Sequence, residues 1–319
     1  MTVVTSAMRD TMESQGEALA RIIDNSQPIA PVADRIRGRQ VLLVGTGTSF
    51  HAAQQGAYLL RHAGLAATAA ASADIAIDGP FPASGTALIA LTHTGRRKRF
   101  TAEVMDHFTA AGGLTIQISA IDVVGADLTT VQPERSAAYS ASHLGALLRI
   151  AQLATALGAK LGDLAAIPAA VDAAYRDEAP PLELPSRLLE FIGGGINQWT
   201  AAEGALKARE TAYVATQGLA TEQFLHGPSV ALRSCDRLVC LDGGGEWAVR
   251  IAEVADAAEA SGVPVTRIRH HELSEPLSIF PLTSAVQRIA LEAAETLGTN
   301  PDSFGRDISG REPWDAIPL

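Results

Sequence analysis

Cysteine and long apolar runs are scarce in this sequence, and each shortage excludes a class of protein. The two cysteines, Cys235 and Cys240, are too few for a disulfide framework and lack the spacing of a metal site. We expect both to be reduced, buried and structural, which predicts a cytoplasmic protein. No window approaches about 18 uninterrupted apolar residues, and residues 1–25 lack the apolar stretch of a signal peptide, so no membrane partner is expected.

Positive charge is also in deficit. Lysine and arginine total 25 against 35 aspartates and glutamates, a formal charge of -10, which argues against a nucleic-acid partner. Hydrophobic residues at 47% and charged residues at 19% indicate a globular protein. The length of 319 residues exceeds what one core usually reaches and predicts two domains.

Short aliphatic runs alternate with helical patterns and predict an α/β fold with mostly parallel, doubly wound sheets flanked by helices. The expected strands are 40–44, 87–91, 114–118, 188–192, 238–241 and 263–268, and the expected helices are 7–24, 52–63, 100–111, 141–160, 163–176 and 198–214. Three prolines between 180 and 185 break the pattern. We therefore predict a first domain over 1–177 and a second over 178–319 that repeats its architecture.

Two loops rich in glycine and hydroxyl groups follow expected strands of the first half. They are Gly45-Thr46-Gly47-Thr48-Ser49 and Thr92-His93-Thr94-Gly95. A loop at the carboxyl end of a parallel strand points backbone N–H groups at an anion, and two loops on adjacent strands converge on one ligand. The alternative is that these residues only cap the helices that follow. Neither loop completes a nucleotide P-loop or a dinucleotide fingerprint.

These loops resemble the phosphate loops of SIS (sugar isomerase) domains. In the second half, Glu203-Gly204-Ala205-Leu206-Lys207-Ala208-Arg209-Glu210 and His226-Gly227-Pro228 are similar to segments in the isomerase half of glutamine–fructose-6-phosphate amidotransferase. Glu13-Ser14-Gln15-Gly16 resembles a stretch at the start of that half. The resemblance implies two tandem SIS domains that bind a phosphorylated sugar or aminosugar, without the glutaminase half.

The resemblance also implies roles for single residues. The substrate and its phosphate would be bound by Gly47, Thr48, Ser49, Thr92, His93, Thr94, Arg97 and Ser140. For Ser140 a role as a helix cap is an equal alternative. No cofactor is implied, and the adjacent His270 and His271 would diverge rather than hold a metal.

Two residues match the family's proton-transferring groups. Glu210 would move a proton between C1 and C2 of the sugar, and the alternative is an exposed glutamate paired with Lys207 or Arg209. His226 would assist ring opening in the site of a neighbouring subunit, which implies a homodimer, and the alternative is a structural histidine.

The sequence departs from the family pattern in three places. No cysteine lies near the N-terminus and no glutaminase-sized segment precedes the motifs, so glutamine-dependent amination is not expected of this chain. The family's C-terminal lysine is missing, and arginine cannot replace a Schiff-base lysine. Gly95-Arg96-Arg97-Lys98-Arg99 stands where the family has Gly-Glu-Thr. We expect Arg97 to bind the phosphate, or the substrate to carry extra negative charge; the alternative is a solvated basic helix start.

The function predicted from these residues is that of an enzyme. It would be a sugar-phosphate aldose–ketose isomerase or an aminosugar-phosphate deaminase or deglycase acting through an enediol-type intermediate. The alternative is a non-catalytic phosphosugar-binding regulatory module. The sequence leaves open which sugar phosphate is bound and whether a nitrogen is involved.

Overall fold

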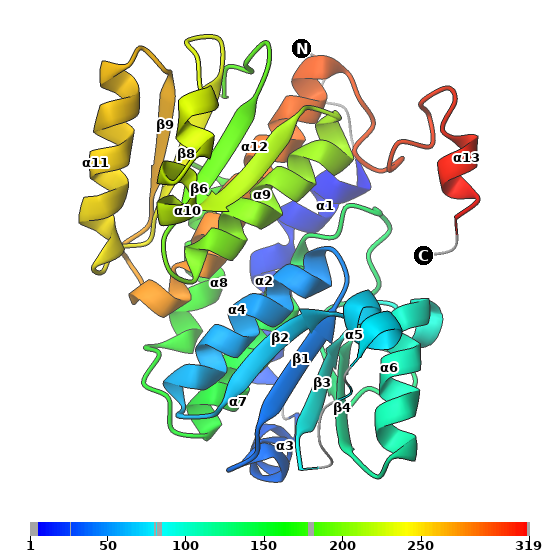
Figure 1. Ribbon diagram of the computed structural model, residues 1–319. Coiled ribbons are helices and arrows are strands. Elements are labelled where there is room, and N and C mark those ends of the chain that lie inside the picture. The colour runs from blue at the N-terminus through cyan, green and yellow to red at the C-terminus, as the bar shows by residue number, and fades with distance from the viewer. Residues whose placement is uncertain (1–5, 26, 80, 82–84, 178–181, 318–319) are drawn as a thin grey trace. The chain divides into compact units, whose positions relative to one another are not determined.

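The computed structural model describes residues 6–25, 27–79, 81, 85–177 and 182–317. Contacts divide the chain into two compact units, described separately here. The first-sheet unit holds residues 17–134, 141–165 and 315–319, and the second-sheet unit holds residues 1–16, 135–140 and 166–314. Each unit is built around one sheet of parallel strands flanked by helices (Figure 1).

The first-sheet unit has the strand order β2-β1-β3-β4-β5, and every pairing is parallel. Its strands are β1 (Val41–Gly45), β2 (Ala67–Ala71), β3 (Ala87–Leu91), β4 (Leu114–Ser119) and β5 (Leu128–Thr129). Its helices are α2 (Gln15–Asp24), α3 (Ile29–Ile36), α4 (Thr48–His62), α5 (Ser72–Asp78), α6 (Arg99–Ala110) and α7 (Ala141–Ala156). The described helices and strands thus alternate along the chain as expected for an α/β fold.

The core of this unit follows from the alternation of side chains along buried strands. Leu42 and Leu88 face Phe108 and its neighbours on α6. On the other face, α4 lies close to the sheet because Gly56 has no side chain: a Cβ there would lie 2.9 Å from Leu43 and 2.5 Å from Ile150 of α7. The two faces are therefore covered by different helices, as in a doubly wound sheet.

The second-sheet unit has the order β7-β6-β8-β9, also parallel throughout. Its strands are β6 (Leu189–Gly193), β7 (Thr216–Ala220), β8 (Arg237–Asp242) and β9 (Val265–Arg269). Helices α9 (Asn197–Ala212) and α12 (Ile279–Leu297) cover one face, and α11 (Trp247–Ala260) covers the other. The remaining helices are α1 (Ala7–Glu13), α8 (Ile167–Tyr175), α10 (Thr221–Leu225) and α13 (Glu312–Asp315). In chain order, the strands of the two sheets are arranged alike.

The structure bears on two further expectations. The leading helix expected over 7–24 is two helices, because it ends at Ser14, whose hydroxyl donates to the Asp10 carbonyl at 2.9 Å. The expected boundary at 178 falls on residues 178–181, which lie outside the described residues. Helix α8, which precedes this segment, packs against α12 within the second-sheet unit. The two units are therefore not divided at a single position in the chain. The domain boundary at 178 stays a prediction.

The expectation that both cysteines are buried is wrong for one of them. Cys240 is buried on β8, and burial raises the pKa of its thiol to about 12. Cys235 is exposed because it lies in the turn before that strand. Among the described residues, no helix has both the length and the apolar composition needed to cross a bilayer.

Candidate functional site

The loops after β1 and β3 lie side by side, because the two strands are neighbours with Val44 opposite Ala90. The chain leaves β1 for β2 on one side of the sheet, while β3 leads to β4 on the other. Such a switch point opens a crevice at the carboxyl ends of the strands, where ligands of doubly wound sheets bind. The structure therefore brings the two predicted phosphate loops together.

The loop after β1 is shorter than expected, because α4 begins at Thr48 rather than near residue 52. Gly47 has φ 58° and directly precedes the helix, and a Cβ on Gly45 would lie 2.4 Å from the Ser49 carbonyl. Only glycine allows this close turn. Thr48 and Ser49 thus lie in the first turn of α4, where the helix dipole favours an anion, and the Ser49 N–H donates to the Thr46 carbonyl at 3.2 Å.

In the loop after β3, Thr92 shapes the backbone. Its hydroxyl donates to the Gly95 carbonyl at 2.7 Å, and the residue is 4% exposed. Gly95 has φ 65°, and a Cβ there would lie 2.4 Å from Val123. Thr94 is half-buried directly before the 3-10 turn Gly95–Arg97. Thr92 therefore holds the turn that presents the rest of the loop.

His93 is held through a residue that the sequence did not single out. Its Nε2 accepts a hydrogen bond from the backbone N–H of Glu134 at 3.0 Å, so the ring carries its proton on Nδ1. Burial lowers the pKa of His93 and keeps the ring neutral near pH 7. The Glu134 carboxylate in turn accepts the backbone N–H of Ser142 in the first turn of α7, at 2.8 Å. Glu134 thereby links the β3 loop to α7, and no spacing pattern in the sequence reveals it.

The basic cluster at 96–99 is divided by its ion pairs. Arg96, in the 3-10 turn, pairs with Asp106 of α6, and Arg99 pairs with Glu103 at 2.8 Å along α6. Arg97 is exposed and Lys98 is half-buried. Within the ranges that the structure describes, neither of these two forms an ion pair or a hydrogen bond with another side chain.

Glu210 lies on α9 in a line of charged groups. Buried Lys207, 1% exposed, forms ion pairs with Glu210 and, at 3.6 Å, with Glu203, whose side chain is 0% exposed. The Glu210 side chain is 14% exposed, so the pairing with Lys207 that the alternative supposed is present, whereas the exposure that it supposed is not. Arg209 instead donates its Nε to the Thr216 carbonyl at 2.8 Å.

His226 and Ser140 occupy different surroundings. His226 is exposed at the end of α10, before Gly227 with φ 147° and Pro228, which begins a 3-10 turn. Ser140 is fully buried directly before α7, and its carbonyl accepts a hydrogen bond from Gln287 at 3.3 Å. The roles of both residues stay predictions.

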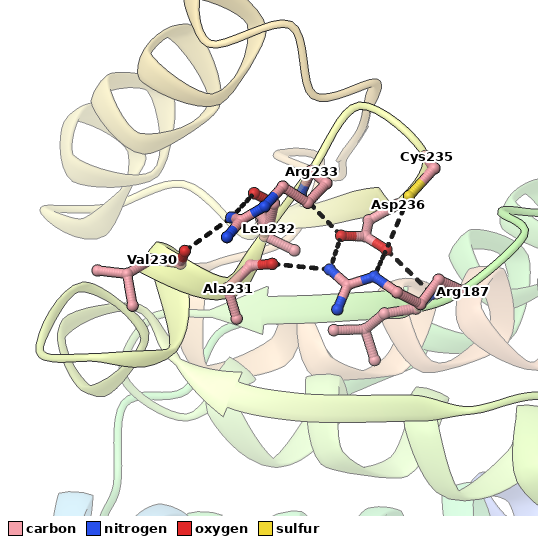
Figure 2. A network of polar contacts seen from close by, with 8 residues as sticks. Arg187, Val230, Ala231, Leu232, Arg233, Cys235 and Asp236 are labelled. Carbon is pink, nitrogen blue, oxygen red and sulfur yellow. Dashed lines mark hydrogen bonds and ion pairs between the residues drawn. The ribbon is translucent and has the colours of Figure 1, made fainter.

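The segment that follows His226 is anchored by a buried carboxylate (Figure 2). Asp236, with 0% side-chain exposure, forms an ion pair with Arg187 and accepts the backbone N–H groups of Leu188 at 3.2 Å and Arg233 at 2.7 Å. Arg187 also donates to the Ala231 carbonyl at 2.7 Å. The network fastens the turn between α10 and β8 to the start of β6, which fixes one end of the segment that carries His226.

Next to this network lies Glu190, a buried carboxyl that no ion pair neutralises among the described residues. It is 1% exposed, and burial together with the charge of Asp236 raises its pKa from 4.5 to about 7. The folded state therefore holds more protons than the unfolded state between these values. The contribution of Glu190 to the free energy of unfolding is fully present below pH 4.5 and is lost as pH rises through about 7.

We expect the variant Glu190→Gln to remove this pH dependence. The neutral amide avoids burying a charge, so at pH 8 the variant should be more stable than the parent by up to about 3 kcal/mol, with a small difference at pH 5. Urea unfolding at both pH values measures the effect. Equal stability differences at pH 5 and pH 8 would contradict the assignment.

No group of three or more histidine, cysteine, aspartate or glutamate side chains arranged to hold a metal ion occurs within the described ranges. In the first-sheet unit, hydroxyl, backbone amide, imidazole and guanidinium groups around the β1 and β3 loops suit an anionic ligand. In the second-sheet unit, the carboxylate of Glu210 on α9 is a group that can transfer a proton.

The chain is similar in sequence to curated proteins that share one name. It is 27% identical over 308 residues to glutamine–fructose-6-phosphate aminotransferase (isomerizing) of Pyrococcus horikoshii, covering 82% of this chain and 50% of that protein. The corresponding protein of Thermococcus kodakarensis is 26% identical, covering 87% of this chain and 53% of that protein. The chain thus spans about half the length of the curated relatives it matches. No family model matches the sequence.

Solved structures share the fold. The C-terminal domain of glucosamine–fructose-6-phosphate aminotransferase from Francisella tularensis superposes with a TM-score of 0.78 at 16% identity, covering 94% of this chain and 99% of that one. Tagatose-6-phosphate ketose/aldose isomerase from Escherichia coli superposes with a TM-score of 0.79 at 16% identity, covering 93% of this chain and 95% of that one. Glucosamine-6-phosphate deaminase from Thermotoga maritima superposes with a TM-score of 0.78 at 18% identity, covering 93% of this chain and 97% of that one. The resemblance to the isomerase half of the amidotransferase is confirmed, and the α/β fold matches an SIS fold.

Proposed function

We propose that this chain is a sugar-phosphate enzyme of two tandem SIS domains, catalysing aldose–ketose isomerisation or removal of the amino group from an aminosugar phosphate. The observation that carries the proposal is the ion pair of Glu210 with the buried Lys207. Burying charges costs free energy, and a module that only binds its ligand has no need of a carboxylate held in this way. The matching strand order of the two sheets supports the tandem arrangement.

The loops after β1 and β3 bind the phosphate in this proposal. Backbone N–H groups of Gly47 and Thr48 and the hydroxyls of Ser49 and Thr94 donate to its oxygens, as does the neutral His93 through Nδ1–H. Thr92 holds the turn, and Arg97 follows in the 3-10 turn Gly95–Arg97. Ser140 contributes near the sugar hydroxyls.

Glu210 acts as the base. It takes the proton from the carbon beside the carbonyl, and the electron pair of that C–H bond forms the double bond of an enediolate. The proton then returns to the former carbonyl carbon, while the hydroxyl proton of the first carbon passes to the former carbonyl oxygen, so that carbonyl and hydroxyl exchange places. The Lys207 ammonium favours the ionised carboxylate that this step needs. His226 assists ring opening in the site of a second subunit, and its exposure at the end of α10 supports a role outside its own subunit. The homodimer and the cytoplasmic location are predictions of the same proposal.

The test is to incubate the chain in deuterated water with fructose 6-phosphate, tagatose 6-phosphate and glucosamine 6-phosphate. Deuterium at C2 without ammonia identifies an isomerase, and ammonia release identifies a deaminase. Thermal stabilisation by a phosphosugar with neither signal would favour the alternative, a regulatory binding module. No exchange, ammonia or stabilisation with any sugar would overturn the proposed function.

A further inference from the structure

The basic cluster after β3 carries more positive charge than one phosphate group needs. The loops after β1 and β3 already carry hydroxyl groups, and α4, a helix of 15 residues, begins at the first of these loops. Neutral donors and a helix dipole suffice to bind a phosphate. Two further cations beside them therefore call for another explanation.

The ion pairs separate the cluster into two kinds of side chain. Arg96 and Arg99 are neutralised by Asp106 and Glu103, two residues of α6. The Arg99–Glu103 pair joins adjacent turns and stabilises that helix. Arg97 and Lys98 form no such pair with any described residue, although acidic residues outnumber basic ones in the whole chain, 35 to 25. Both lie before the first turn of α6, where the helix dipole disfavours positive charge.

We infer that Arg97 and Lys98 bind a second anionic group on the substrate. This rests on the proposed function, since the first phosphate occupies the crevice between the loops. A second phosphate or a carboxylate on the sugar would relieve both the repulsion between the two cations and their conflict with the dipole. The substrate class is thus a sugar with two oxyanion groups, namely a sugar bisphosphate or a phosphorylated sugar acid.

The test compares ligand affinities by calorimetric titration in one buffer of fixed ionic strength. The ligands are fructose 6-phosphate, fructose 1,6-bisphosphate and 6-phosphogluconate, which separate a second phosphate from a carboxylate. We expect the parent chain to bind one of the two doubly charged ligands at least about 10-fold tighter than the monophosphate. Arg97→Gln and Lys98→Gln should each abolish most of that preference and leave monophosphate affinity within about twofold.

Arg96→Gln is the matched control, because it removes the same charge from a side chain already paired with Asp106. It should keep the preference. Equal affinity of the parent chain for all three ligands would overturn the inference and leave the proposed function standing. A loss of monophosphate binding in Arg97→Gln as large as the loss for the doubly charged ligands would also overturn it, since Arg97 would then bind the single phosphate. Failure of every phosphosugar to bind would count against the proposed function itself.

Discussion

Replacing Glu210 by Gln should lower the rate of C2 proton exchange by about 10³-fold, because an amide cannot accept the substrate proton. The shape of the side chain is kept, so ligand affinity should change by less than about threefold. Exchange is followed by NMR in deuterated water with saturating sugar phosphate, and affinity by titration of the same preparation.

The matched control is Glu292→Gln on α12. Glu292 is also a partly buried glutamate that pairs with a basic neighbour, Arg288 at 3.0 Å, but it has no proposed catalytic role. Its exchange rate should stay within about twofold of the parent rate. Undiminished exchange in the Glu210 variant would exclude this residue as the base, and loss of both binding and exchange would point to a structural role instead.

The central strands could be predicted from the sequence because their own residues specify them. Aliphatic runs at 41–45, 87–91 and 189–193 are buried on both faces, and the expected and observed strands agree to within one residue at each end. Strands β2 and β7 were not predicted. Their sequences, Ala67–Ala71 and Thr216–Ala220, consist mostly of small and polar residues at the sheet edge, held in place by pairing with β1 and β6. Tertiary context decides their structure.

The same distinction holds for the candidate site. Glycines at 45, 47 and 95 mark the two loops of the candidate site, because close approach and positive φ leave a visible requirement in the sequence. The residues that contact those loops leave no such requirement in the sequence. Glu134 meets His93 across 41 residues, and Asp236 meets Arg187 across 49. Such pairs arise only once the parallel sheet brings distant segments together.

The effect of the α9 charges on stability also depends on how deeply the side chains are buried, which residue spacing alone does not predict. Positions 203, 207 and 210 lie on one side of a helix, so a salt-bridged line of side chains is expected there. The structure adds that Glu203 and Lys207 are 0% and 1% exposed. A surface pair of this kind contributes little to stability, whereas removing one member of a buried pair leaves the other charge buried and uncompensated.

The variant Lys207→Met should therefore be destabilised by about 3–5 kcal/mol, because it leaves Glu203 buried without its counter-charge. Methionine fills a similar volume, so the loss comes from charge rather than from a cavity. Urea unfolding measures the change, and Lys160→Met, at an exposed lysine, should differ from the parent by less than about 0.5 kcal/mol. The double variant Glu203→Gln/Lys207→Met removes both charges and should recover most of the lost stability. If the double variant is as unstable as the single one, packing around Lys207 outweighs its ion pairs.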